Sequence, residues 1–134
     1  MTKQSKLQAA ACPCGGPKPY SECCGRWHEG PQAMQAPTAE TLMRSRYSAF
    51  VLDKLPYLLA TWHPSTRPAS LDPNPPDLKW LGLAIKQTGS QDPEHATVEF
   101  VARSRQAGRA HRLHELSRFV REDGLWFYVD GDLY

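Results

Sequence analysis

The sequence predicts an α+β fold, in which two helices pack on one face of a curved, four-stranded antiparallel sheet. Two observations predict it. Apolar residues recur with helical spacing in the first half of the chain, and they alternate with polar residues after residue 78. Three short segments, 89–95, 106–108 and 122–124, contain turn residues and separate the alternating runs, which favours hairpin connections.

The segment 36–54 is expected to form the first helix. Thr38 is a suitable N-cap, and Glu40 follows in the first turn, where the helix dipole favours a carboxylate. One apolar stripe then runs along the helix, formed by Met43, Tyr47, Phe50 and Val51. A second, shorter helix is expected at 55–62, with Leu58, Leu59 and Trp62 on its apolar side and Pro64 preventing its continuation.

Four strands are expected at 78–88, 96–105, 109–122 and 124–133. In the first strand, alternation places Leu81, Leu83 and Ile85 on one face. In the third strand it separates two sets of residues, and the sequence does not say which set faces the helices. One set is Leu113, Glu115, Ser117 and Phe119; the other is His114, Leu116, Arg118 and Val120.

Composition limits the class of protein. The 134 residues, of which 40% are hydrophobic, suit one compact domain with a short appendage. The net charge of +2 excludes a general polycation, so any anion-binding role must rest on a local patch. Neither a signal-peptide core nor an apolar run of roughly 18 residues is present, and we therefore expect a cytoplasmic protein without a membrane partner.

All four cysteines lie in the segment 11–25, "ACPCGGPKPYSECCG". Thiolates are soft ligands, and four of them suit a tetrahedral zinc ion. A disulfide is disfavoured in a reducing compartment, and the C-x-x-C spacing typical of a redox dithiol is absent. Four thiolates leave no open coordination position, so one structural Zn²⁺ per chain is expected. The predicted ligands are Cys12, Cys14, Cys23 and Cys24. His28 is either a substitute ligand, for example in place of Cys24, or a solvent-facing histidine.

This cysteine pattern resembles the SEC-C motif, a small zinc-binding element named for its place at the C-terminus of the SecA preprotein translocase. The usual motif has Gly-Ser-Gly-Lys after the second cysteine, whereas this chain has Gly-Gly-Pro-Lys at 15–18. The loop differs but the ligands do not. Because the SecA element contacts partner proteins, the resemblance implies a protein partner for this chain.

The body of the chain resembles the YchJ-like family of uncharacterised bacterial proteins. The resemblance rests on "LMRSRYSAF" (42–50), "ATWHPSTR" (60–67) and "ELSRFVREDGLWFYVDG" (115–131) after an N-terminal SEC-C element. It implies a fold like that of nuclear transport factor two, a cone-shaped roll of helices on a curved sheet. It also implies two parts, a zinc element at 1–30 and the roll at 31–134, but no known reaction.

A roll of this kind encloses a pocket between its helices and its sheet, and pockets with converging polar groups bind ligands. The candidate lining residues are Tyr47, Trp62, His114, Ser117, Arg118, Trp126 and Tyr128. Glu115 and His63 are acid–base candidates if the protein is an enzyme. Glu115 has an alternative role, an ion pair with Arg44 or Arg46 that braces the helix on the sheet, and His63 has one at the end of the second helix.

A basic patch is expected around the second hairpin, formed by Arg103, Arg105, Arg109 and Arg112. Lys3, Lys6, Lys18 and Arg26 are expected to extend it. RNA, the ribosome or an acidic protein would suit such a surface, whereas a solvated hairpin tip is the alternative. The sequence thus favours an interaction module. The alternative is an enzyme acting on a small substrate in the pocket, and a homodimer through the sheet is a further expectation.

Overall fold

The computed structural model describes residues 10–134. A 3₁₀ helix, η1 (Tyr20–Glu22), and a short helix, α2 (Gly25–His28), precede the two main helices, α3 (Ala39–Val51) and α4 (Leu55–Ala60). Four strands follow, β1 (Leu78–Asp92), β2 (His95–Gln106), β3 (Arg109–Glu122) and β4 (Leu125–Leu133). They pair in the order β1-β2-β3-β4, and every pair is antiparallel. The α+β class and the two-helix, four-strand order predicted from the sequence are confirmed.

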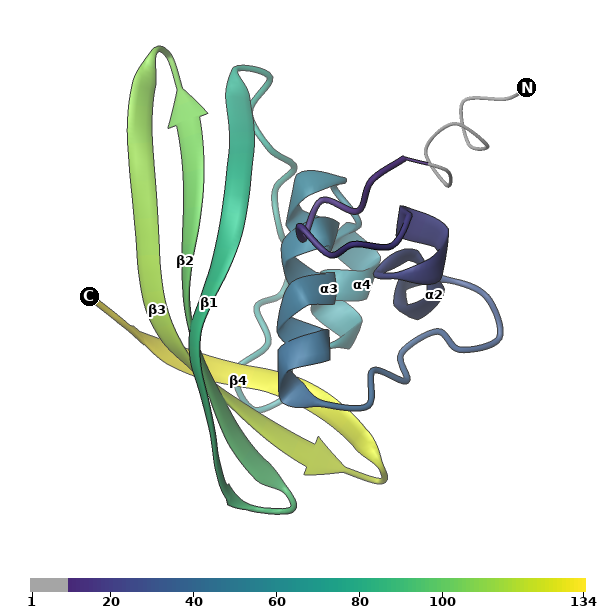
Figure 1. Ribbon diagram of the computed structural model, residues 1–134. Coiled ribbons are helices and arrows are strands. Elements are labelled where there is room, and N and C mark those ends of the chain that lie inside the picture. The colour runs from purple at the N-terminus through teal and green to yellow at the C-terminus, as the bar shows by residue number, and fades with distance from the viewer. Residues whose placement is uncertain (1–9) are drawn as a thin grey trace.

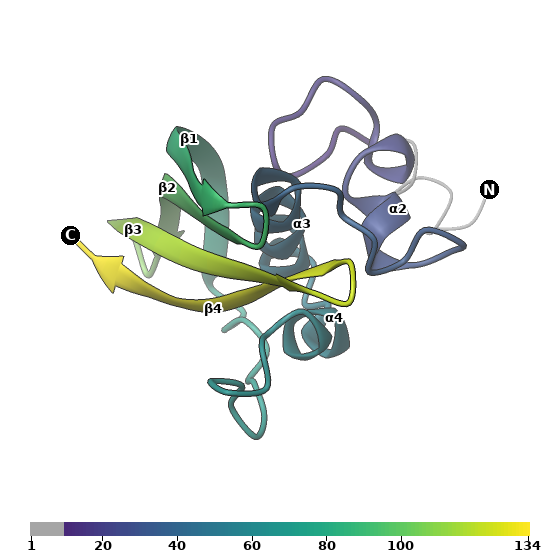
Figure 2. The same cartoon turned by 90° about the horizontal axis from the view of Figure 1, so that it is seen from below.

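The molecule has three layers. The twisted sheet forms one layer, α3 and α4 cover one of its faces, and the N-terminal segment with α2 lies on the far side of α3 (Figures 1 and 2).

No helix within residues 10–134 has the length and hydropathy needed to cross a bilayer.

Helix α3 is buried on two sides. It begins as predicted, with the Thr38 side chain accepting a hydrogen bond from the backbone N–H of Thr41 at 3.1 Å. Toward the sheet, the ring of Tyr47 lies 5.7 Å from that of Trp80 on β1. On the side of the N-terminal segment, Ser45 and Ser48 are fully buried. This helix is therefore the middle layer that connects the sheet to the cysteine-containing segment.

The inner face of the sheet carries the core. Val98, Phe100 and Ala102 of β2 are buried, and so are Ser117 and Phe119 of β3. The set containing Glu115 therefore faces the helices, which the sequence left open. His114 and Arg118 lie on the outer face.

One expected core residue is not in the core. Leu81 is 53% exposed, because the pairing of β1 with β2 shifts register between Trp80 and Gly82. Such a bulge reverses the direction of a side chain relative to strict alternation. The prediction that Leu81 shares a face with Leu83 and Ile85 is wrong for this reason.

The chain leaves α4 along the sheet. Tyr128 of β4 donates its backbone N–H to the carbonyl of Thr61 at 2.9 Å, and its own carbonyl accepts from the N–H of His63 at 2.8 Å. Trp62 lies between these two bonds. It is therefore held against β4 beyond the end of α4 instead of within the helix.

Candidate metal centre and neighbouring pocket

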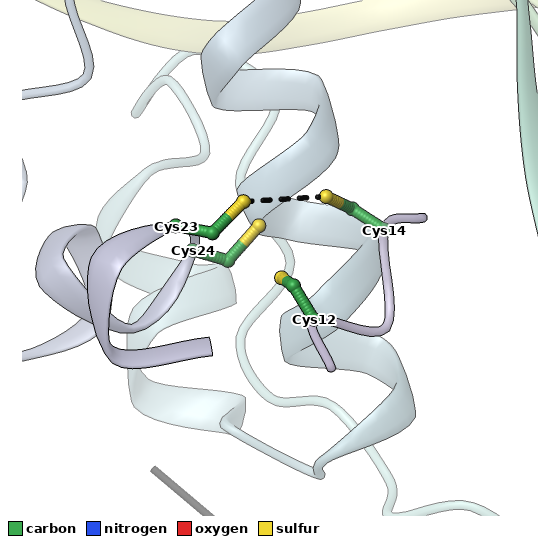
Figure 3. Close-up of side chains that lie close together, drawn as sticks. All are labelled: Cys12, Cys14, Cys23 and Cys24. Carbon is green, nitrogen blue, oxygen red and sulfur yellow. Dashed lines mark hydrogen bonds between the residues drawn. The ribbon is translucent and has the colours of Figure 1, made fainter. Parts of the chain in front are cut away.

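The four cysteine side chains converge on one point (Figure 3). Their Sγ atoms lie within 4.8 Å of one another, and those of Cys14 and Cys23 are 3.6 Å apart. Four sulfurs at about 2.3 Å from a tetrahedral Zn²⁺ are separated by about 3.8 Å, so this spacing needs little adjustment to hold such an ion. The cluster can hold a metal ion, and its donor set is that of a soft or borderline cation.

Two local turns bring the cysteines together. The N–H of Gly15 bonds to the carbonyl of Cys12 at 3.1 Å, which closes a turn around Cys14, and Gly15 has φ of +85°, a conformation that glycine adopts without strain. Cys23 ends η1 and Cys24 precedes α2, so the adjacent cysteines lie at the junction of two helices. A Cβ on Gly25 would lie 2.7 Å from the carbonyl oxygen of Tyr20, so glycine is required at that position.

The thiols influence one another strongly. Hydrogen bonds from Cys14 and Cys24 hold the pKa of Cys12 far below its ordinary value. Burial, together with hydrogen bonding to Cys12 and Cys14, raises the pKa of Cys23 to about 12. Hydrogen bonds to the same two residues raise the pKa of Cys24 well above its ordinary value. The thiol of Cys12 therefore ionises readily, whereas those of Cys23 and Cys24 resist ionisation, and a bound cation would favour the thiolate form of both.

The cysteine segment packs on α3. The Sγ of Cys12 lies 3.6 Å from the Oγ of Ser48, and Nη1 of Arg44 donates to the carbonyl of Cys14 at 3.3 Å. Cys12, Cys14 and Cys24 are buried. The segment is thus fixed to the helical layer.

His28 has neither of the two roles predicted for it. Its Nε2 donates to the carbonyl of Ser45 at 2.8 Å, which leaves Nδ1 to accept from the hydroxyl of Tyr20 at 2.6 Å. Burial lowers its pKa, in keeping with this neutral tautomer. His28 is a partly buried link between α2 and α3, because both of its ring nitrogens are occupied by hydrogen bonds within the protein.

Residues 38–131 match the family model described as "YchJ, middle NTF2-like domain". A UPF0225 protein of Bordetella parapertussis is 67% identical over 131 residues, which are 98% of each chain. Another, from Chromobacterium violaceum, is 54% identical over 96% of this chain and 97% of its own length. The chain belongs to the YchJ-like family. The boundary between two parts at residue 30 stays a prediction.

Two solved structures share the fold of this YchJ-like chain. The solution structure of a SEC-C motif containing protein from Rhodopseudomonas palustris has a TM-score of 0.77 and 30% identity, and the match covers 92% of this chain and 98% of that one. The crystal structure of a SEC-C motif containing protein from Psychrobacter arcticus has a TM-score of 0.78 and 31% identity, with 96% and 85% covered. The family and fold implied by the sequence resemblance are thereby confirmed.

A pocket lies between α3 and the inner face of the sheet of the YchJ-like chain. Its volume is about 190 Å³. Of the predicted lining residues it contains Trp62, Ser117 and Tyr128, and it also contains Glu115. Its other members were not predicted from the sequence; they are Met43, Arg46, Phe50, Phe100 and Leu113. Arg46 could have been predicted from the helical spacing, because it lies three residues after Met43 and four before Phe50, on the same face of the helix.

Four predicted lining residues lie elsewhere. Tyr47 packs on Trp80, and Nε1 of Trp126 donates to the carbonyl of Pro37, just before α3, at 3.3 Å. His114 and Arg118 are on the outer face, because strand alternation places them opposite to Glu115 and Ser117. His114 bonds there to Glu99 at 2.7 Å, and Arg118 forms ion pairs with Asp130 and Asp132.

Glu115 and His63 do not meet. Nε2 of His63 bonds to Glu122 at 2.9 Å, and Nδ1 accepts from the Ser65 hydroxyl, 2.7 Å away, outside the pocket that Glu115 lines. The acid–base pair suggested by the sequence is therefore not assembled.

The brace predicted for Glu115 is also absent. Glu115 accepts hydrogen bonds from Ser117 and Tyr128. Arg44 pairs with Glu40, and Arg46 bonds to Leu58 and Thr61. The predicted ion pair to Arg44 or Arg46 is wrong, because the carboxylate instead accepts from two hydroxyl groups of the sheet at Oε2.

The second hairpin carries the predicted basic patch. Arg103 and Arg112 lie directly opposite each other across β2 and β3, and Arg105 and Arg109 flank the turn. All four are exposed, and none forms an ion pair with another residue of the described chain. The N-terminal segment with α2 is separated from this hairpin by α3 in both views (Figures 1 and 2). Lys18 and Arg26 belong to that segment by sequence, so they are not part of the hairpin patch. Lys3 and Lys6 lie outside the described residues.

Proposed function

We propose that the four cysteines hold one structural zinc ion, and that the zinc-held segment presents a fixed surface to a protein partner. The observation that carries the zinc site is the mutual approach of four Sγ atoms to within 4.8 Å. Four thiolates complete a tetrahedral site, so the ion has no position left for a substrate. A reducing cytoplasm, which keeps the thiols free, is part of the proposal.

The partner surface follows from the anchoring of the segment. The loop 15–19 has Cys14 before it and Cys23 and Cys24 after it, so a bound ion would fix both of its ends. Lys18 is exposed, and the Arg26 guanidinium lies 4.5 Å from the centre of the Trp27 ring. No salt bridge within residues 10–134 involves Lys18 or Arg26. A rigid loop loses little conformational entropy on binding. Its Lys18, together with Arg26 of α2, favours an acidic protein surface.

Metal analysis tests the zinc site. Mass spectrometry of the full chain, purified under reducing conditions, is expected to give one zinc per chain. Cys24→Ser is expected to lose the ion, whereas Ser48→Ala, beside the cluster but not a ligand, is expected to retain it. Reduced wild-type protein without zinc would contradict the proposal.

Site-specific photo-crosslinking tests the partner. A photoreactive residue at position 18 is compared in cells with one at position 86, an exposed lysine of β1. The expected result is a discrete crosslinked protein from position 18 alone, and its loss when Arg26→Glu is added. Equal crosslinking from both positions would mean that the loop is not the binding surface.

RNA binding through the basic hairpin is a second candidate. The specific observation is the direct pairing of Arg103 with Arg112, since like charges opposite each other in a sheet are destabilising until an anion bridges them. Removing two phosphate contacts with the double variant R103A/R112A is expected to reduce the slope of log affinity against log salt by about 1.4 for single-stranded RNA. An unchanged slope would exclude the hairpin. The homodimer through the outer sheet face stays a prediction, which sedimentation velocity can test.

A further inference from the structure

The pocket behind α3 contains hydrogen-bonding groups that the protein itself does not use. It is separated from the cysteine cluster by the helix, and it is independent of the zinc ion and of any partner of the N-terminal segment. Arg46, Trp62 and Glu115 line it together with apolar side chains of α3, β2 and β3.

The unused donors belong to Arg46 and Trp62. Arg46 is only 3% exposed, and both of its hydrogen bonds run through Nη1, to the carbonyl of Leu58 at 2.8 Å and to the hydroxyl of Thr61 at 2.7 Å. Within the described chain, Nε and Nη2 donate to no group. Nε1 of Trp62 is also buried, and it has no partner in the described part of the chain. Because a buried donor without an acceptor costs free energy, the indole N–H of Trp62 favours an incoming acceptor, and Arg46, which lines the same pocket, has further donors for it.

The unused acceptor belongs to Glu115. Both of its hydrogen bonds, from the hydroxyls of Ser117 and Tyr128, reach Oε2, and no group among residues 10–134 bonds to Oε1. The carboxylate is also fixed in place, because Gly131 lies against it so closely that a Cβ there would be 2.6 Å from Cδ of Glu115. A ligand therefore meets an acceptor of fixed direction.

The charges of the pocket balance. Burial lowers the pKa of Arg46 to about 10, so its guanidinium remains charged at neutral pH. Its charge faces the centres of the Trp62 and Tyr128 rings at 5.1 and 4.7 Å, which adds to its stabilisation in the pocket. With one cation and one carboxylate in place, a charged ligand would be attracted by one group and repelled by the other.

We propose that this pocket binds a small neutral carboxamide with an apolar body. Its carbonyl oxygen accepts from Arg46 and Trp62, its amide N–H donates to Oε1 of Glu115, and its body lies among Met43, Phe50 and Phe100. The volume of about 190 Å³ is below that of drug-sized sites, roughly 300–1,000 Å³, and suits a single ring.

Three matched probes test the ligand class. Benzamide, benzoate and benzylamine share the ring and differ in charge. They are titrated into the zinc-loaded, ¹⁵N-labelled full chain while the indole N–H resonances are followed. Benzamide is expected to shift the Trp62 resonance saturably and to bind at least roughly tenfold more tightly than either charged probe. Resonances of Trp80 and Trp126 are internal controls, because both indoles already donate within the fold, to Asn74 and to Pro37.

A charge variant separates this site from nonspecific ring binding. In Glu115→Gln the cation of Arg46 remains without its opposing carboxylate, so benzoate is expected to bind more tightly than benzamide. Glu99→Gln makes the same charge change on the outer face of the sheet and is expected to leave the order of the probes unchanged. The proposal is overturned if benzamide does not move the Trp62 resonance or if benzoate binds the wild type as tightly as benzamide. It is also overturned if the order of the two affinities does not invert in Glu115→Gln.

Discussion

His28 shows how one partly buried side chain couples stability to pH. Its two ring nitrogens bond to Tyr20 and Ser45, and burial, the largest effect, lowers its pKa from the ordinary 6.5. The unfolded chain therefore binds a proton more readily than the folded one. The stability contributed by neutral His28 is fully present above pH 6.5 and is lost as the pH falls through the lower folded value.

The expected consequence is a smaller acid sensitivity in His28→Gln. Between pH 8 and 5.5, in excess zinc, the free energy of unfolding of the wild type should fall more than that of this variant. Denaturant titration at both pH values gives the change in the free energy of unfolding for each protein. Subtracting the change in the variant from that in the wild type removes the effect of zinc loss, which both proteins share. His111→Gln, on the exposed end of β3, serves as the control and should follow the wild type. Identical pH dependence in all three proteins would contradict a lowered pKa of His28 in the folded state.

Thr38 gives a second prediction for a single residue. Its hydroxyl accepts the N–H of Thr41 at the start of α3. Thr38→Ala removes this cap and should lower the free energy of unfolding by about 1 kcal/mol. Thr38→Ser keeps the hydroxyl oxygen and should lower the free energy of unfolding by less than half as much. If urea denaturation shows equal losses for both variants, the hydroxyl does not cap the helix.

The Thr38 cap and the four cysteines were predictable because each is a local pattern. The partners of Glu115 were not. The sequence does not show whether the Glu115 side chain points toward Arg46. Only the register of β3 with β4 brings Tyr128 and Gly131 next to Glu115. His63 likewise has a local reason to lie near the end of α4, but its contact with Glu122 spans 59 residues.

The turns of the last two hairpins differ at their first positive-φ position, which is Ala107 in one turn and Asp123 in the other. Asp123 and Gly124 connect β3 to β4 with φ of 52° and 78°, and Ala107 and Gly108 connect β2 to β3 with φ of 51° and 77°. Positive φ at both positions is typical of a type I′ turn, which favours Asn or Asp followed by Gly. Ala107 therefore adopts a conformation that its Cβ disfavours.

Ala107→Asn is expected to stabilise the protein by about 0.5–1 kcal/mol. Asn tolerates the left-handed conformation better than Ala, and the exposed turn has room for the longer side chain. Thermal denaturation measures the gain. Ala110→Asn, at an exposed strand position of the same hairpin, should not stabilise, because Asn is disfavoured in strands. A loss of stability in Ala107→Asn would mean that the turn is not of this type.

Alternation predicted the strands well but could not predict the bulge. The buried set on β2 is the expected one, yet Leu81 leaves the core where the ladder shifts at Gly82. For α3, the stripe of Met43 and Tyr47 indicated one buried face. The other buried face carries Ser45 and Ser48, and small polar residues give no hydrophobic signal; their burial follows from the contacts of the N-terminal segment.

Because α3 lies between the cysteine segment and the sheet, the metal and the sheet are expected to stabilise different parts of the molecule. The cysteine segment contacts α3, whereas the sheet core around Val98, Phe100 and Phe119 contacts the opposite side of that helix. Loss of the ion should therefore release residues 10–30 first, weaken α3 next, and affect the sheet least. Hydrogen exchange resolves these stages, because opening can be local as well as global.

After chelation of zinc under reducing conditions, amide exchange is expected to become fast at 20–28, to accelerate moderately in α3 and to remain slow in β2 and β3. The physical reason is that four uncompensated thiols no longer hold the turns around Cys14 and Cys24, while the strand ladder keeps its hydrogen bonds. Cys24→Ser should reproduce the pattern without chelator, and chelator should not change it further. Uniformly fast exchange in all three layers would mean that the ion stabilises the whole fold as one cooperative unit, and unchanged exchange would mean that the segment is held by α3 alone.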